Sequence, residues 1–445
     1  MALPRIHQVT AGMAAAGLCL LGPVPALTQG TDGGRLAELR FSQQLERDDG
    51  VSSTTTGLGV SLASRTRSSH LEFSADGGLE HDFNDSSPSS VQDPRVILSY
   101  GRESRSSALD LSFSYREDDV DSDFTEEDLD GRVLNFGDGT RRSMSTDLSL
   151  VTGRDAVFGT SLDLGYDSLT YSGTNDPSLI DEETRRAALA LRFQLDPQLS
   201  TELRATFRDR DRADQGTDTR YESFGVSADY AISEALSTSL YVGHSRTTED
   251  GITGESTEKG FTYDLSVILD RPNGTLTGSL SSDIDEAGQR TTARLTRSMD
   301  LPTGALTAGA GLSSSQGDSL RPLVSLAYSK DLPRGSLGAS AEQAFTTDSD
   351  GDEVLNSRFS LSYRHSLTPL SSFQAGLGLS QTDYISADSE DGDRLWLDLS
   401  YRHNLAADWD IVSGYSHSLS KKGDADREYS NKVYISLEKS IQWRF

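Results

Sequence analysis

The residues of this sequence best suited to catalysis are histidines that stand beside an acid or a hydroxyl group. His81 precedes Asp82 and His244 precedes Ser245, pairings in which a histidine can act as a general base. A hydrolase also needs an activated nucleophile, and the sequence has no nucleophile elbow of the Gly-x-Ser-x-Gly type. We therefore interpret these pairs as chance neighbours in an acid-rich chain and predict that the protein is not an enzyme.

Acidic clusters offer the only candidate ligands for a metal ion. The segment 348–353 (DSDGDE) brings Asp348, Asp350 and Asp352 together, and 388–393 (DSEDGD) is similar. Glu353 stands at the sixth position, where an EF-hand loop requires glycine. The sequence therefore predicts solvated loop tips and no firm metal site, and binding of hard cations by the first cluster is a weaker hypothesis.

A third acidic segment, from Arg116 to Thr140, has a composition that a simple surface loop does not need. It holds ten acids against two arginines, with six large apolar side chains interleaved. The acids that we select as candidate functional residues are Asp118, Asp119, Asp121, Asp123, Glu126, Glu127, Asp128 and Asp130. The apolar residues suggest that the segment folds against another part of the protein.

The composition of the chain limits the remaining classes. Its 445 residues include 41 Lys and Arg against 69 Asp and Glu, which gives a net charge of −28, and only one cysteine. A nucleic-acid-binding protein carries a basic surface, so this acidic composition excludes nucleic acid as a partner. One cysteine also excludes a disulfide scaffold.

Apolar side chains recur at every second position along nearly the whole chain. Leu109, Leu111, Phe113 and Tyr115 form one such series, and residues 395–401 form another. A period of two is typical of a β-strand with one apolar face. About 22 such segments follow one another, with a range of about 20 to 24. No change of period divides them, so we predict a single all-β domain.

The connections between these segments alternate between two kinds. Short neutral turns such as 301–304 and 332–335 take turns with longer acidic loops, for example 46–50, 117–139 and 247–258. This alternation predicts an up-and-down antiparallel sheet with every long loop at one end. An even strand number places both termini at the short-turn end, and closure into a barrel removes the exposed edges.

The N-terminal segment has the features of an export signal. Arg5 precedes an apolar stretch, 11–22, and Val24 and Ala26 supply small residues before the expected cleavage point. The predicted domains are therefore a signal peptide, 1–26, and a barrel, 27–445. Too few residues separate Ala26 from the first strand to form an N-terminal plug.

The C-terminal strand decides between a membrane barrel and a soluble one. Residues 434–445 (YISLEKSIQWRF) alternate apolar and polar side chains and end on Phe445. In this strand the chain resembles Gram-negative outer-membrane β-barrel proteins of the porin type, so a transmembrane β-barrel in the cell outer membrane is expected. The resemblance implies that Ile441, Trp443 and Phe445 form the signal read by the barrel-assembly machinery.

One position departs from this pattern, because Lys439 falls in register with the lipid-facing side chains near the middle of the last crossing. A lysine there costs about 2–4 kcal/mol. We expect a local bulge or a protein contact that covers Lys439.

The opposite face of the strands is expected to line a polar lumen. The charged residues assigned to this face by alternation are Asp110, Asp147, Arg192, Arg204, Asp229, Asp264, Arg294, Arg358, Arg364 and Arg402. Two interpretations stay open. The charges either create a transverse field across the pore, as the resemblance to porins implies, or form salt bridges within the wall that fix the barrel's shape.

The resemblance also gives the acidic segment 116–140 a role, because the third extracellular loop of porins folds into the barrel and narrows it. We expect this loop to make the passage cation-favouring. No cofactor is expected, although divalent cations held by the acidic loop tips could bridge to lipopolysaccharide phosphates. The other expected partners are outer-membrane lipid and small hydrophilic solutes, and a homo-oligomer is one of the expected states.

These observations predict a channel for passive diffusion of small hydrophilic solutes. The alternative is a non-catalytic export or assembly barrel, such as one that passes a secreted polysaccharide, because a barrel of this size encloses a wide lumen.

Overall fold

The computed structural model describes residues 34–83, 90–120, 139–175, 179–213, 217–251, 254–285, 288–315, 320–347, 353–385, 391–406, 408–423 and 426–445. Within these ranges every regular element is a β-strand. None of the described residues forms a helix long and apolar enough to cross a membrane. The predicted signal peptide, 1–26, lies outside the described residues.

The strands follow one another at regular intervals. The first eleven are β1 (Gly34–Asp48), β2 (Val51–Arg65), β3 (Ser69–Asp82), β4 (Ser90–Glu103), β5 (Ser107–Asp119), β6 (Thr140–Thr152), β7 (Phe158–Ser172), β8 (Glu182–Gln194), β9 (Leu199–Arg212), β10 (Thr217–Ser233) and β11 (Leu236–Gly251). The others are β12 (Gly254–Arg271), β13 (Gly274–Asp285), β14 (Gly288–Leu301), β15 (Gly304–Ser315), β16 (Arg321–Leu332), β17 (Gly335–Thr347), β18 (Glu353–Thr368), β19 (Ser371–Tyr384), β20 (Gly392–Ala406), β21 (Trp409–Lys422) and β22 (Glu428–Arg444).

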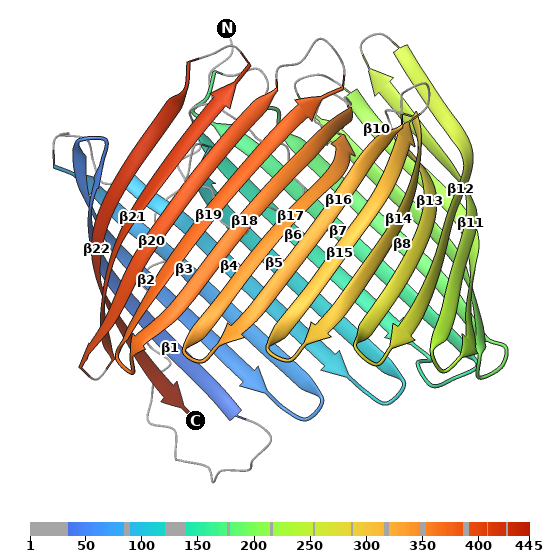
Figure 1. Ribbon diagram of the computed structural model, residues 1–445, viewed down its shortest axis with the longest axis horizontal. Helices are drawn as coiled ribbons and strands as arrows, with labels where there is room; N and C mark the ends of the chain where they lie inside the picture. The colour runs from blue at the N-terminus through green and yellow to red at the C-terminus, as the bar shows by residue number, and fades with distance from the viewer. Residues whose placement is uncertain are drawn as a thin grey trace, which may run out of the picture.

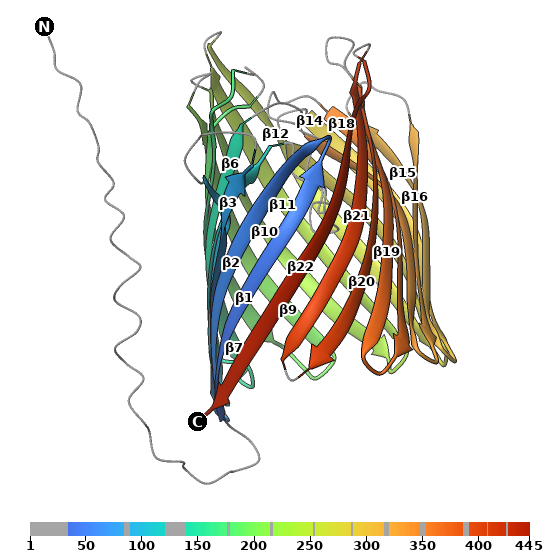
Figure 2. The same cartoon turned by 90° about the vertical axis from the view of Figure 1, so that its left-hand side faces the viewer.

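Each strand pairs antiparallel with its sequence neighbours, and β22 pairs with β1, so that the 22 strands form one closed sheet. Figures 1 and 2 show that the described strands form one cylinder and are tilted relative to its axis. The prediction of a single up-and-down β-barrel of about 22 strands is confirmed. Closure leaves no unpaired strand edge, which is how such a sheet satisfies its backbone groups in lipid.

The seam between the first and last strands closes at the chain's C-terminal residue. The backbone N–H of Arg35 donates to the carbonyl of Phe445 at 3.2 Å, and the N–H of Phe445 donates back at 3.0 Å. The start of β1 and the end of β22 therefore lie together at the short-turn end of the barrel, as predicted (Figure 2).

The prediction of a long loop is wrong at two places. Residues 247–258 continue β11 and β12 as a paired hairpin, and only residues 252–253 connect the two strands. Residues 46–50 reduce to the two-residue turn Asp49-Gly50, whose φ angles are 42° and 96°. An Asp-Gly pair with positive φ at both positions matches the twist of a β-hairpin. A strand that extends beyond the membrane meets water on both faces, so its sequence can be acidic throughout.

Lys439 does not lie at mid-depth, which corrects the position expected from the sequence. It pairs with Trp409, the first residue of β21, and the next residue, Ser440, donates its backbone N–H to the carbonyl of Asp408 in the adjoining turn at 3.3 Å. Lys439 is therefore near the short-turn end. No bulge interrupts β22 there, but the Lys439 ammonium lies 4.8 Å from the centre of the Trp409 ring. A protein contact thus covers the charge, as one of the two expectations stated.

Candidate functional site: the inner wall

The two faces of the barrel wall differ in chemistry. One face carries large apolar side chains that remain exposed, and among them are Leu58, Val60, Leu62, Phe224, Val226, Leu240, Val242, Ile435 and Leu437. The other face carries charged side chains that meet across intervening strands. Arg294 of β14 lies 4.0 Å from Glu342 of β17, although β15 and β16 stand between them. Such reach is natural on the concave side of a closed sheet, so we name this polar face the inner wall.

The ion pair between Arg40 and Asp76 shows how the inner wall is built. Arg40 of β1, Gly59 of β2 and Asp76 of β3 form one row across three strands. A Cβ atom added at Gly59 would come within 2.8 Å of the Asp76 carboxylate and 3.1 Å of the Arg40 Nε atom. The side chains of Arg40 and Asp76 therefore bond each other directly over bare backbone. A glycine in a strand interior is otherwise unfavourable, and here it permits the close approach.

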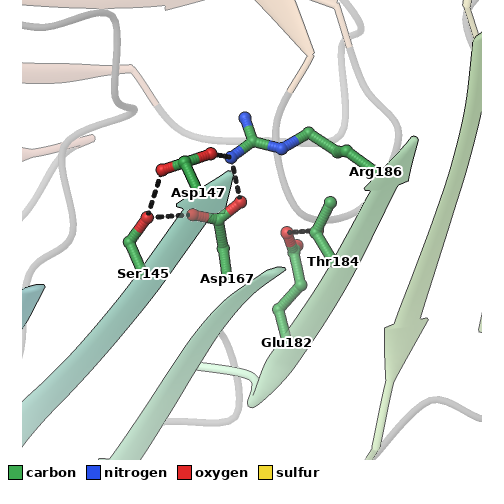
Figure 3. Close-up of polar contacts among 6 residues, drawn as sticks. All are labelled: Ser145, Asp147, Asp167, Glu182, Thr184 and Arg186. Carbon is green, nitrogen blue, oxygen red and sulfur yellow. Dashed lines mark hydrogen bonds and ion pairs between the residues drawn. The ribbon is translucent and has the colours of Figure 1, made fainter. Parts of the chain in front are cut away.

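A second group with the same plan surrounds Arg186 (Figure 3). Asp147 of β6, Gly165 of β7 and Arg186 of β8 form a row, and a Cβ atom at Gly165 would lie 2.8 Å from the Arg186 Nε atom. The guanidinium lies 3.1 Å from Asp147 and 2.7 Å from Asp167. The hydroxyl of Ser145 donates to Asp167 at 2.8 Å. One positive charge thus lies between two carboxylates, and the group keeps a net negative charge.

Arg402 of β20 links three strands beside the seam between β22 and β1, on the side away from the Arg40 group. Its guanidinium lies 3.0 Å from Asp410 of β21 and 2.8 Å from Glu438 of β22. All three side chains are 30–44% exposed. Water screens pairs with this exposure, so each adds little to stability. Their effect is to link the Arg402 side chain to β21 and β22.

Strand alternation places all ten charged residues selected from the sequence on the inner wall: Asp110, Asp147, Arg192, Arg204, Asp229, Asp264, Arg294, Arg358, Arg364 and Arg402. Several of them bond to the wall itself. Arg192 donates to the carbonyls of Gly153 and Arg154 at 2.9 and 2.7 Å, and Arg204 lies 2.8 Å from Glu202. For these arginines, and for Arg402, the geometry favours the interpretation of salt bridges and hydrogen bonds within the wall.

Sequence reasoning missed other charged residues of the inner wall, some of which are partners of the ten selected residues. Arg40, Asp76, Asp167, Arg186 and Glu438 were not selected, although each belongs to an ion pair of the inner wall. A signal for some of them is present in the sequence. It is a glycine at an inward position of one strand, level with opposite charges in the two strands beside it, and it requires the strand register to be known.

The acidic segment 116–140 is described only at its two ends. Asp118 is 3% exposed and is held between Arg141 and Arg116, whose Nε atom lies 3.4 Å away. Val120 is 6% exposed, whereas Asp119 is exposed. Asp121, Asp123, Glu126, Glu127, Asp128 and Asp130 lie outside the described residues. At the start of this loop Val120 is therefore packed and the charge of Asp118 is balanced by arginines. The role of the loop as a constriction stays a prediction.

The rim at the long-loop end has one further nearly buried charge pair. Arg290 of β14 donates to Glu353 of β18 at 2.8 Å, and both side chains are at most 12% exposed. The hydroxyl of Ser315 also donates to Glu353. Asp348, Asp350 and Asp352, the weak metal candidates beside Glu353, lie outside the described residues. Among the residues that the structure describes, no group of three His, Cys, Asp or Glu side chains could hold a metal ion.

A closed antiparallel barrel with an apolar outer face and a polar inner wall has the architecture of an outer-membrane β-barrel protein. The predicted location in the cell outer membrane follows from this fold. The sequence matches no protein-family description and no curated protein.

Solved structures share the fold at low sequence identity. The FrpB iron transporter from Neisseria meningitidis (F3-3 variant) has a TM-score of 0.61 and 10% identity, over 93% of this chain and 82% of that one. The ferric citrate transporter FecA has a TM-score of 0.57 and 11% identity, over 94% and 80% of the two chains. The copper transporter OprC has a TM-score of 0.54 and 12% identity, over 93% and 80%. The chain thus has the barrel fold of these transporters.

Proposed function

We propose that the protein is an outer-membrane channel for passive diffusion of small hydrophilic solutes. The observation that carries the proposal is the inner wall, where charged side chains pair along the surface and leave polar groups facing the lumen. A polar lumen wall of this kind suits hydrated solutes. The solved proteins of the same fold are described as iron, copper and ferric citrate transporters, which supports transport as the broad class.

The same proposal makes the passage cation-favouring. The Arg186 group carries two carboxylates for one guanidinium, and the segment 116–140 adds ten acids against two arginines. Fixed negative charge raises the local concentration of cations and lowers that of anions. No catalysis is assigned to the protein, and its proposed partners are outer-membrane lipid, lipopolysaccharide and the barrel-assembly machinery.

The alternative function is a non-catalytic export or assembly barrel, for example for a secreted polysaccharide. The barrel's 22 strands favour it, because a lumen of this size is wider than small solutes require.

Conductance of the purified protein in planar bilayers tests the proposal and separates it from the alternative. A stable channel sized for small solutes, with a reversal potential that shows cation preference, is expected. Deletion of residues 120–138 should reduce that preference. A silent protein or a very large pore contradicts passive diffusion and favours the export barrel. Anion preference, or a preference that the deletion leaves unchanged, contradicts the role of the loop.

A further inference from the structure

A hollow in the inner wall has a different chemistry from the ion pairs around it. It is a cavity of about 550 Å³ between β17 and β21, within the range of small-molecule sites. Its inward lining consists of Arg364, Gln374, Trp396 and Asp398, together with Gly376 of β19 and serines of β17, β18 and β21. Serines and glycine surround the four larger side chains, and this difference in size creates the hollow.

Trp396 lies flat on the floor of this hollow. A Cβ atom added at Gly376 would lie 2.6 Å from the six-membered part of the indole, and one at Gly378 would lie 1.9 Å from its Nε1 atom. One face of the ring therefore covers the backbone of β19, and the other face is turned to the lumen. The Trp396 N–H has no hydrogen-bond acceptor within the described part of the chain. Such a buried donor is normally paired. Because this N–H group is buried against β19, a ligand in the hollow would contact the open face of the ring and not the N–H group.

The polar groups beside the ring supply both signs of hydrogen bond. In the row next to Trp396, Gly376 pairs with Asp398, and in the row beyond it Arg364 pairs with Gln374. The guanidinium offers only donors, the carboxylate only acceptors, and the amide both. A site for a charged solute would carry an excess of one charge, whereas Arg364 and Asp398 balance. A flat apolar platform with mixed donors and acceptors at its edge matches a sugar ring, which has C–H bonds on its faces and hydroxyl groups around its rim.

We propose that this hollow is a binding site for a pyranose sugar, stacked on Trp396 and held through its hydroxyl groups by Arg364, Gln374 and Asp398. The inference deepens the proposed function, because it names saccharides as a class of solute that enters the lumen. It holds equally for diffusion of small sugars and for passage of a polysaccharide chain.

Binding to the full-length protein, folded in detergent micelles, tests the site without any need for conductance. The probes are maltotriose and cellotriose, titrated by isothermal calorimetry and by saturation-transfer NMR. Saturable binding of at least one of them is expected. Trp396→Ala should weaken it by about tenfold or more, and Trp396→Phe, which keeps a flat ring, should retain most of it.

Tyr241 provides a matched control, because its ring lies over Gly225 and Gly243 of β10 and β11 in the same way but outside the hollow. Tyr241→Ala should bind the sugars as the unchanged protein does. If Trp396→Ala does not fold, Arg364→Gln together with Asp398→Asn replaces it, with the same loss expected. The proposal is overturned if neither trisaccharide binds, or if both pocket variants bind undiminished. A protein that conducts but binds no sugar refutes this site alone, and one that binds but does not conduct refutes the channel alone.

Discussion

Asp147 and Arg186 meet at 3.1 Å across the backbone of Gly165, and the same Nη2 atom of Arg186 lies 2.7 Å from Asp167. The charge of the guanidinium is thereby shared by two carboxylates. Groups of this kind set the charge of the inner wall locally, whatever the net charge of the chain.

Replacing Arg186 by glutamine should raise the cation preference of the channel. The change removes the one positive charge of the group and leaves Asp147 and Asp167 facing the lumen without it. The measurement is the reversal potential in a salt gradient. Arg105→Gln removes the same charge from a side chain that is 95% exposed in a short turn, and it should leave the reversal potential unchanged. Equal effects of the two variants would contradict the assignment of Arg186 to the lumen.

Gly165→Val should lower the stability of the folded barrel by about 1–2 kcal/mol, because the added side chain occupies the space of the Arg186 and Asp147 contact. The free energy of unfolding in urea measures the effect. Gly278→Val is the control, since a Cβ atom there meets only Leu295 at 3.9 Å. We expect the control to be neutral or stabilising in a strand. A loss at Gly278 as large as that at Gly165 would show that valine is harmful at any strand glycine.

Asp118→Asn should destabilise the barrel by about 1–3 kcal/mol, because it removes the buried negative charge that Arg141 and Arg116 share. Asp119 is the matched control, since it is the next residue of the same loop root and its side chain is exposed. Asp119→Asn should change the free energy of unfolding by less than about 1 kcal/mol. Similar values for the two variants would mean that Asp118 is not the residue that anchors this loop.

Removing the Trp409 ring should expose the Lys439 ammonium to the membrane. Trp409→Ala is expected to lose the cation–π contact and the ring's own burial, whereas Trp409→Phe keeps a ring and should lose less. Lys439→Met should be neutral or stabilising by up to about 1 kcal/mol, because a lipid-facing lysine near the edge of the membrane is only slightly unfavourable. Unfolding in lipid vesicles compares the three variants. A strongly destabilised Lys439→Met variant would show that the ammonium has a further role.

Chelation should lower the thermal stability if the acidic loop tips hold divalent cations. The expected result is a lower unfolding temperature in EDTA, restored by added Mg²⁺ or Ca²⁺. The variant with Asp348, Asp350 and Asp352 all changed to Asn should show a smaller response to EDTA. An unfolding temperature that EDTA does not change would remove the hypothesis of cation-bridged loops.

The strand pattern was predictable because each crossing strand meets lipid on one face and water on the other. That contrast gives Leu109, Leu111 and Phe113 their regular spacing, and it recurs in the other segments that cross the membrane. The contrast disappears above the membrane. Residues 247–258 therefore gave no period of two, and the sequence could not distinguish a hairpin from a loop there.

The inner wall was only partly predictable, because alternation assigns a side chain to a face but not to a partner. Arg402 could be placed inward from its position in the strand, but its contact with Glu438 depends on how β20, β21 and β22 are aligned. The hollow at Trp396 has the same origin. It arises from serines and a glycine on four strands, around side chains that become their neighbours only when the register is known.

The backbone bonds between Arg35 and Phe445 have a kinetic meaning as well as a structural one. They join residues that lie far apart in the sequence, so among the described strand pairings the seam has the largest loop-closure entropy. Each strand from β2 to β22 pairs with the strand that precedes it in the sequence. The second edge of β1, in contrast, stays unpaired until β22 has formed. Strand β22 thus completes the closure, and a chain without it would expose the edges of β1 and β21.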